Sequence, residues 1–165
     1  MERKDLLDSL REKKAHLSSR ESLTGGRFAS AFTSIPGASN VFAGAAVTYT
    51  DKAKEKFGVK VSTIDQYGAI SEQTAKERAI EASLFFNTEC SVSFTGNAGP
   101  SASENKPVGL VYIAIKVFDK RNVYELHLKG DRDSIRRECV DFAFLERKQR
   151  LDETSFGKKE ESSPI

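Results

Sequence analysis

Residues 108–118 (VGLVYIAIKVF) carry apolar side chains on both alternations of an extended chain. A strand that is apolar on both faces needs cover on both, so we expect it inside a sheet with helices on each side. Along the rest of the chain, helix-like segments alternate with strand-like segments, and residues 119–128 complete a hairpin with this strand. The sequence therefore predicts an α/β fold: a three-layer α/β/α domain with a mixed, mostly parallel sheet and a late β-hairpin.

Periodicity, capping and turn residues place the remaining elements. Ser71 is expected to cap a helix, and segment 62–65 (STID) fits a capping box, with a hydroxyl three residues before a carboxylate. The residues of 41–50 are typical of a buried strand. We expect a single domain over 1–148 and a disordered polar tail over 149–165. Helices are expected over about 1–15, 27–34, 51–57, 71–86 and 132–147, and further strands over 16–20 and 90–95.

The charge and the cysteine content exclude several classes of function. Lys plus Arg (26) against Asp plus Glu (24) leaves a net charge of +2, so we expect no nucleic-acid partner. No run approaches the ~20 apolar residues that cross a bilayer, and the first residues contain no apolar signal segment. This predicts a cytoplasmic protein without membrane attachment. Cys90 and Cys139 are expected to be reduced thiols, and together with His16 and His127 they give no metal-binding spacing.

Three loops that follow strands carry the residues best suited to chemistry. Ligands of open α/β sheets collect at the carboxyl ends of strands, where segments 22–26 (SLTGG), 49–54 (YTDKAK) and 95–100 (TGNAGP) are expected. Ser22 can serve as a nucleophile if Lys54, desolvated or close to another cation, acts as its base. Taken alone, the same two residues are as well explained by a helix N-cap and a solvated lysine.

Three further candidates have side chains that suit polar or anionic ligands. Tyr49 ends a strand, where its phenol either relays a proton or plugs the core. The Thr95 hydroxyl and the neighbouring backbone groups either hold a substrate or form a plain turn. Arg136 and Arg137 lie early in the last helix, where a guanidinium either binds phosphate or carboxylate in bidentate fashion or faces solvent.

Six segments, taken in chain order, carry a family resemblance. They are ESLTGG (21–26), SIPGASNVFAGAAVTYTDKAK (34–54), YGAISEQTA (67–75), TGNAGP (95–100), NKPVG (105–109) and GDRDSIRR (130–137). Together they resemble the CinA C-terminal domain family, the nicotinamide mononucleotide (NMN) deamidases, over about residues 19–144. Each segment alone is weakly specific, whereas all six in this order are highly specific.

The resemblance implies an amidohydrolase of NAD salvage, in the pyridine nucleotide cycle, that converts NMN to nicotinic acid mononucleotide and ammonia. It implies that Ser22 is the nucleophile, Lys54 the general base and Tyr49 the tyrosine beside that base. No metal or other cofactor is expected, the partner is the small-molecule substrate, and a homodimer is favoured. Amides near Gly25 and Gly26 are expected to hold the oxyanion. Substrate binding is expected from Thr24, Gly25, Gly26, Thr95, Gly96 and Arg136, and Arg136, Arg132 or backbone amides are left open as the groups that hold the phosphate.

The chain departs from the family pattern at several positions. Asp51 replaces the usual asparagine, and a carboxylate there favours protonated Lys54. Leu23 replaces cysteine, Asn97 replaces an apolar residue, and 101–103 lacks the usual glycines. The larger molybdopterin-binding-like domain of long family members does not precede it, which predicts a stand-alone form. Two alternatives stay open: a non-catalytic nucleotide- or partner-binding module of this fold, and an amidase for another small substrate.

Overall fold

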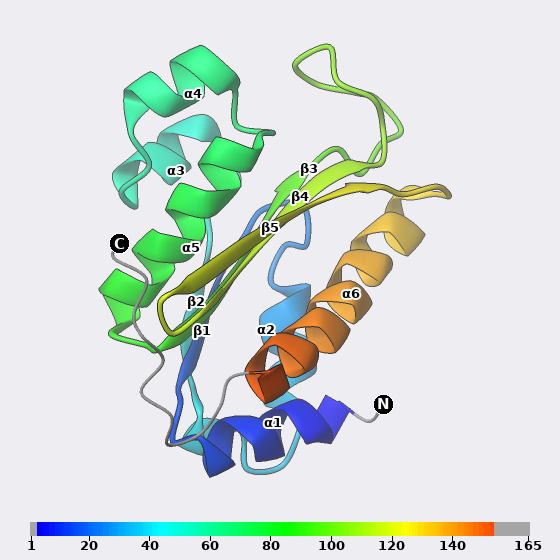
Figure 1. The fold of residues 1–165 in the computed structure, drawn as a ribbon. Helices are drawn as coiled ribbons and strands as arrows, with labels where there is room; N and C mark the ends of the chain where they lie inside the picture. Colours follow the sequence, from blue (N-terminus) through cyan, green and yellow to red (C-terminus); the bar gives the residue numbers. More distant parts are fainter. Residues whose placement is uncertain (1–2, 154–165) are drawn as a thin grey trace.

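The computed structural model describes residues 3–153, which form a five-stranded sheet with helices on both faces (Figure 1). The helices are α1 (Arg3–Glu12), α2 (Arg27–Thr33), α3 (Asp51–Lys56), α4 (Val61–Tyr67), α5 (Glu72–Phe86) and α6 (Arg132–Glu153), with a short 3₁₀ helix at Ala38–Asn40. The strands are β1 (Leu17–Glu21), β2 (Phe42–Val47), β3 (Cys90–Gly96), β4 (Leu110–Val117) and β5 (Lys120–His127). Helices α3, α4 and α5 lie on one face of the sheet, and α1, α2 and α6 lie on the other.

The strands are arranged in the order β2-β1-β3-β4-β5. β1 pairs in parallel with both β2 and β3, whereas β4 is antiparallel to its neighbours β3 and β5. β4 therefore runs against the other four strands, which place their carboxyl ends at one edge. The predicted three-layer α/β fold with a mixed sheet and a late hairpin is confirmed.

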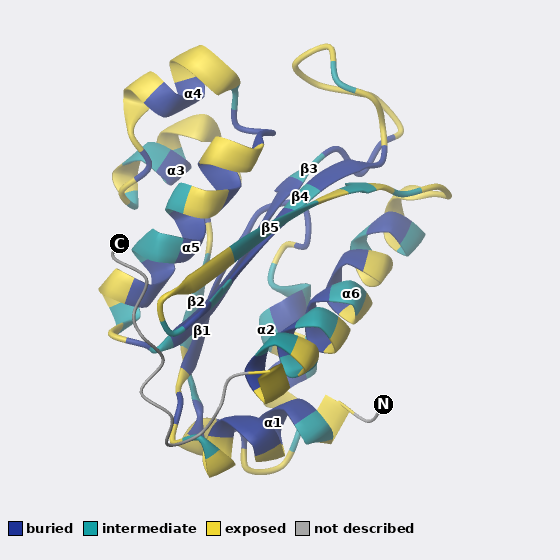
Figure 2. Ribbon diagram, viewed as in Figure 1, coloured by how far each residue is buried: buried dark blue, intermediate teal, exposed yellow. Residues whose placement is uncertain are grey.

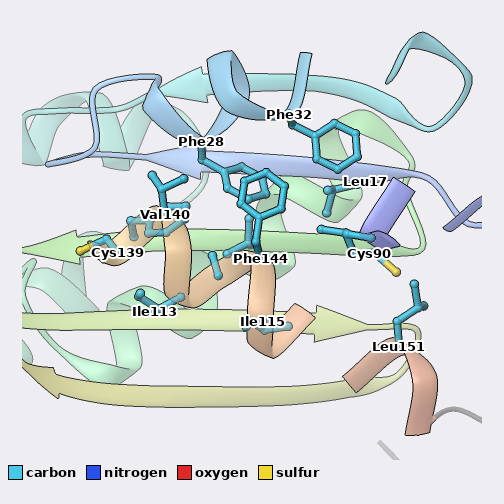
Figure 3. Close-up of a cluster of buried hydrophobic side chains, with 14 of the residues drawn as sticks. Leu17, Phe28, Phe32, Cys90, Ile113, Ile115, Cys139, Val140, Phe144 and Leu151 are labelled. Atoms are coloured by element: carbon cyan, nitrogen blue, oxygen red, sulfur yellow. The ribbon is translucent and has the colours of Figure 1, made fainter. Parts of the chain in front are cut away.

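The large apolar core lies between the sheet and the layer of α1, α2 and α6 (Figure 3). Phe28 and Phe32 of α2 pack against Phe144 of α6, with their ring centroids 5.1 and 6.0 Å from the Phe144 ring. Ile113 and Ile115 of β4 enter the same core from the sheet. Because each large apolar side chain stabilises the fold by roughly 1.5–3 kcal/mol when it is fully buried, this face is the main source of stability.

On the opposite face, α5 meets the sheet through small and polar side chains. Ala75 and Ala79 form a small apolar cluster with Ala114 of β4. Alternate residues of β3 place hydroxyl groups on this side, and each donates a hydrogen bond to a backbone oxygen in α5 or in the turn before it. The pairs are Ser91–Ala79, Ser93–Ala75 and Thr95–Ala69, at 2.5, 2.6 and 2.8 Å. Directional hydrogen bonds thus fix α5 close to the sheet.

Most of the predicted elements occur within a few residues of their expected positions. Ser71 caps α5 as expected, because its hydroxyl accepts a hydrogen bond from the Thr74 N–H at 3.1 Å. Helix α6 is longer than expected and continues to Glu153, past the predicted start of the polar tail. The division into one domain and a tail otherwise stays a prediction, and residues 154–165 lie outside the described part of the chain.

Two local predictions are wrong. The expected buried strand at 41–50 is the edge strand β2, whose residues are half-buried or exposed, whereas burial is concentrated in β1, β3 and β4 (Figure 2). Helix α4 begins at Val61, so the expected capping box at 62–65 lies inside the helix. Glu77 of α5 supplies the missing acceptor, because its carboxylate receives the Lys60 N–H at 3.1 Å.

Candidate active site

A cavity of about 270 Å³ opens at the edge of the sheet where β1, β2 and β3 end. Its lining comes from residues 22–23 after β1, parts of 49–54 after β2, 69–70 before α5, and most of 95–104 at the end of β3 and beyond it. Arg132, the first residue of α6, completes it. Loops that are far apart in sequence meet here because parallel strands bring their carboxyl ends together.

Ser22 directly follows β1, in a loop that Glu21 holds in place. The Glu21 carboxylate accepts hydrogen bonds from the N–H groups of Gly26, Phe28 and Ala29 at 3.0–3.1 Å. A side chain of β1 thereby satisfies amides at the start of α2 that have no partner within the helix. Ser22 lines the cavity and is 7% exposed.

Lys54 reaches the same point from α3. Thr50 caps this short helix by accepting a hydrogen bond from the Ala53 N–H at 3.1 Å. The Lys54 Nζ lies 3.2 Å from the Ser22 Oγ and donates to the backbone oxygen of Tyr49 at 2.9 Å. Only 3% of Lys54 is exposed. The fold therefore joins a buried hydroxyl to a buried amine from two different loops.

The surroundings of Lys54 favour its neutral amine. Burial, followed by the positive charge of Arg78, lowers the pKa of Lys54 from 10.5 to about 8. The carboxylates of Asp51 and Glu104 act in the opposite direction and raise this pKa, but by less. Asp51 thus opposes the base, as expected, without restoring the ordinary pKa. The free amine of Lys54 is therefore easier to form than that of an exposed lysine.

The phenol of Tyr49 lies with Arg132 at the rim of the cavity. Arg132 donates from Nη2 to the phenol oxygen at 3.1 Å and from Nη1 to the Gly99 backbone oxygen at 2.6 Å. Tyr49 is 57% exposed, and it contacts Lys54 through its backbone oxygen. Of the two arginines of segment 130–137 left open for the phosphate, Arg132 lines the cavity and Arg136 does not.

Gly25 and Gly26 use their amides within the turn that follows β1. The Gly25 N–H donates to the Ser22 backbone oxygen at 2.9 Å, and the Gly26 N–H donates to the Glu21 carboxylate at 3.1 Å. Both glycines have positive φ angles, 61° and 99°, which this tight turn requires. Their amides are engaged within the turn and neither residue lines the cavity, and their roles as oxyanion or substrate ligands stay predictions.

Thr24 and Arg136 also lie outside the cavity lining, and their roles in substrate binding stay predictions. Thr24 is fully buried. Arg136 donates from Nε to the Leu23 backbone oxygen at 2.8 Å and from Nη2 to the Thr24 backbone oxygen at 3.3 Å, so it supports the turn. Leu23 does line the cavity, and within residues 3–153 its N–H donates no hydrogen bond. The Leu23 amide is therefore the better candidate for holding an oxyanion.

Thr95 and Gly96, the last residues of β3, both line the cavity. The Thr95 hydroxyl donates to the Ala69 backbone oxygen at 2.8 Å. A Cβ at Gly96 would lie 2.5 Å from the Leu110 backbone oxygen, so the pairing of β3 with β4 accounts for this glycine. Their roles in substrate binding stay predictions.

The loop between β3 and β4 forms part of the rim and is held by two polar residues. Asn97 donates to the backbone oxygens of Ser103 and Lys106 at 3.2 and 3.0 Å and accepts the Ser103 N–H at 3.1 Å. The Glu104 carboxylate accepts the N–H groups of residues 69–70 at 2.8 and 3.0 Å. Burial alone would raise the pKa of Glu104, but these hydrogen bonds and Lys106 hold it below its ordinary value. Glu104 thus brings a negative charge to the cavity, a role that no motif of the sequence indicates.

Other kinds of site find no support in the described part of the chain. Residues 3–153 contain no group of three or more His, Cys, Asp or Glu side chains placed to hold a metal ion. Cys90 and Cys139 are buried free thiols. None of the helices in this range is both long enough and apolar enough to cross a membrane.

Comparison with known sequences identifies relatives of this chain. A family model described as the CinA C-terminal domain matches residues 2–151. A CinA-like protein of Petrotoga mobilis is 43% identical over 145 residues, which cover 84% of this chain and 35% of that protein. The chain spans about a third of the length of the curated relatives it matches. That it is a stand-alone form stays a prediction.

Solved structures share the fold. The competence/damage inducible protein CihA of Agrobacterium tumefaciens has a TM-score of 0.79 and 34% sequence identity, covering 90% of this chain and 96% of that chain. A competence-damaged protein (CinA) superfamily protein of Escherichia coli has a TM-score of 0.86 and 28% identity, covering 90% and 87%. The cavity lies where the segments that carry the resemblance meet, and the family match spans nearly all described residues. The chain belongs to the CinA C-terminal domain family.

Proposed function

We propose that this protein is an amidohydrolase that converts NMN to nicotinic acid mononucleotide and ammonia by a Ser–Lys mechanism. The observation that carries the proposal is the 3.2 Å contact between the Lys54 Nζ and the Ser22 Oγ in a cavity that buries both residues. A pKa of about 8 makes the free amine of Lys54 accessible near neutral pH, as a general base requires. Membership of the CinA C-terminal domain family supports the choice of substrate.

The proposed reaction has two stages. Lys54 takes the proton of the Ser22 hydroxyl as the oxygen attacks the amide carbon, and the oxyanion that forms accepts a hydrogen bond from the Leu23 N–H. The C–N bond then breaks, and ammonia leaves with the proton held by Lys54. In the second stage Lys54 takes a proton from water, whose oxygen attacks the ester carbon. The acid is released as that proton returns to Ser22.

The charges around the cavity suit both ends of NMN. This nucleotide carries a cationic pyridinium ring and an anionic phosphate. Asp51 and Glu104 offer negative charge to the ring, and Arg132 offers a guanidinium to the phosphate. A cationic ring close to Lys54 further disfavours its protonated form, which keeps the base neutral when substrate is bound.

The first experiment measures ammonia release from NMN by the purified protein and by Ser22→Ala and Lys54→Met. We expect release by the wild type and a loss of roughly 10³-fold or more in each variant, because each lacks one partner of the reacting pair. Both variants should still be stabilised by NMN in a thermal melt. Undiminished turnover in either variant contradicts the assigned roles.

Two other outcomes distinguish the alternatives. Thermal stabilisation of the wild type by NMN without ammonia release indicates a binding module that lacks turnover. Release of ammonia from pyridine carboxamides without ribose phosphate, but not from NMN, indicates an amidase for another small substrate. The test therefore uses a panel of carboxamides with and without the ribose phosphate.

A further inference from the structure

Arg78 is a buried cation in α5 that the proposed reaction does not use. It is 1% exposed and lies on the helix face that carries the buried Ala75, Ala79 and Ala82. Burying a charge on such a face is unfavourable unless the charged group is hydrogen-bonded. The place of the guanidinium therefore depends on its hydrogen-bond partners.

These partners lie at the ends of the three parallel strands. Arg78 donates from Nη1 to the Phe94 backbone oxygen in β3. It donates from Nη2 to the Glu21 backbone oxygen in β1 and to the Thr48 hydroxyl after β2, both at 3.0 Å. The Thr48 N–H donates to the same Glu21 oxygen at 2.8 Å. One guanidinium thus joins β1, β2 and β3 near their carboxyl ends.

Each of these acceptor residues directly precedes a residue of the cavity lining. The lining residues are Ser22, Tyr49 and Thr95. We propose that Arg78 is a positioning residue of this site, whose planar fork sets the three strand ends so that Ser22 meets Lys54. The inference rests on the proposed Ser–Lys chemistry and deepens it. A guanidinium suits this task because its donors are fixed in one plane.

Arg78 also acts on Lys54 through its charge. The charged groups that face Lys54 are Arg78 on α5, Asp51 on α3 and Glu104 in the loop after β3. After burial, Arg78 is the main cause of the low pKa of Lys54, whereas both carboxylates raise that pKa. The charged neighbours of Arg78 itself are Arg20, Glu81 and Glu21. Arg78 therefore offsets Asp51, the carboxylate that departs from the family pattern.

The test compares Arg78→Met with Arg147→Met. Arg147 is a matched control because it is also fully buried and donates to a backbone oxygen of β3, that of Ser91 at 2.6 Å, but from α6 on the opposite face. Lys54 is titrated by NMR of ¹³C-labelled lysine, with Lys54→Met identifying its signal. The nucleophile is probed by the rate at which a fluorophosphonate modifies Ser22, followed by mass spectrometry.

We expect Arg78→Met to raise the Lys54 midpoint by roughly one pH unit and to slow the modification of Ser22 at pH 8 by ~10-fold or more. Arg147→Met should lower stability but leave both quantities at their wild-type values. If Arg78→Met keeps the wild-type midpoint and the wild-type rate, Arg78 is a core residue only and the proposal is overturned.

Arg78→Lys separates positioning from charge and carries the test if Arg78→Met does not fold. It keeps the positive charge but replaces the fork by one ammonium group. We expect a Lys54 midpoint that remains near 8 together with slower modification of Ser22. An undiminished rate contradicts the positioning role. Neither readout needs NMN, so failure of the proposed substrate is seen separately, as the absence of ammonia release by the wild type.

Discussion

Asp51 is the residue through which the pH dependence of the site can be adjusted most directly. Its carboxylate raises the pKa of Lys54, which burial and Arg78 lower to about 8. The free amine is the active form, so kcat/KM should rise with pH through about 8 in the wild type. Asp51→Asn removes the opposing charge, lowers the pKa of Lys54 further and moves this rise to lower pH.

The measurement is the pH profile of kcat/KM for ammonia release, with Asp65→Asn as the control. Asp65 is an exposed carboxylate of α4 that does not affect the pKa of Lys54. The midpoint of the profile should lie at lower pH in the Asp51 variant than in the wild type, and the control should keep the wild-type midpoint. A profile for Asp51→Asn that moves to higher pH contradicts this account.

At the scale of single residues, the proposed reacting side chains could be predicted from the sequence, but the hydrogen bonds that position them could not. Ser22 and Lys54 stand in resembling segments, and the structure places them 3.2 Å apart. Gly25 and Gly26 stand in the same segments, but their amides are used by the turn. The sequence places Arg78 on the alanine-rich face of α5, where a charged residue is unusual. Its three acceptors could not be predicted, because they come from strands whose order only the fold reveals.

Among the elements, the start of α2 depends most on one side chain. The Glu21 carboxylate accepts three backbone N–H groups there, and Gly26 at the N-cap position has no side chain with which to cap the helix. Glu21→Gln keeps the shape but removes the charge and one acceptor oxygen. We expect a loss of about 2 kcal/mol in the free energy of unfolding, measured in urea, because hydrogen bonds to a charged group are lost.

Glu138→Gln is the control for this prediction, since Glu138 is an exposed residue of α6. Its free energy of unfolding should change by less than ~0.5 kcal/mol. Because Ser22 directly follows Glu21, the Glu21 variant should also lose ammonia release beyond its loss of folded protein. Equal effects of the two substitutions would show that the three amides do not depend on the carboxylate.

The boundaries of elements could be predicted where the stabilising partner lies in the same segment. Ser71 caps α5 with its own hydroxyl, and the sequence indicates that helix start correctly. For α4 the acceptor is Glu77, which belongs to the following helix, so a local pattern at 62–65 was misleading. Likewise, small and β-branched residues predicted the strand at β2 but not its place at the sheet edge, which depends on the order of all five strands.

Across the whole molecule, the large apolar core and the contacts that lower the pKa of Lys54 lie on different faces of the sheet. Phe144 is 2% exposed in the large apolar core, and Phe144→Ala should lower the free energy of unfolding by roughly 3–5 kcal/mol. Leu145→Ala, at a neighbouring position that is 52% exposed, should change it by less than ~1 kcal/mol. The folded fraction of each variant should keep the wild-type pH profile of kcat/KM for ammonia release, because neither residue lines the cavity.

The hydroxyl-lined contact between β3 and α5 has an evolutionary consequence. Substitutions on α5 that change the surroundings of Lys54 leave the phenylalanine core on the other face intact. The effect of such a substitution depends on the hydrogen-bond partners that the sheet offers, as it does for Arg78. Changes in the surroundings of Lys54 can therefore accumulate separately from changes in the large apolar core.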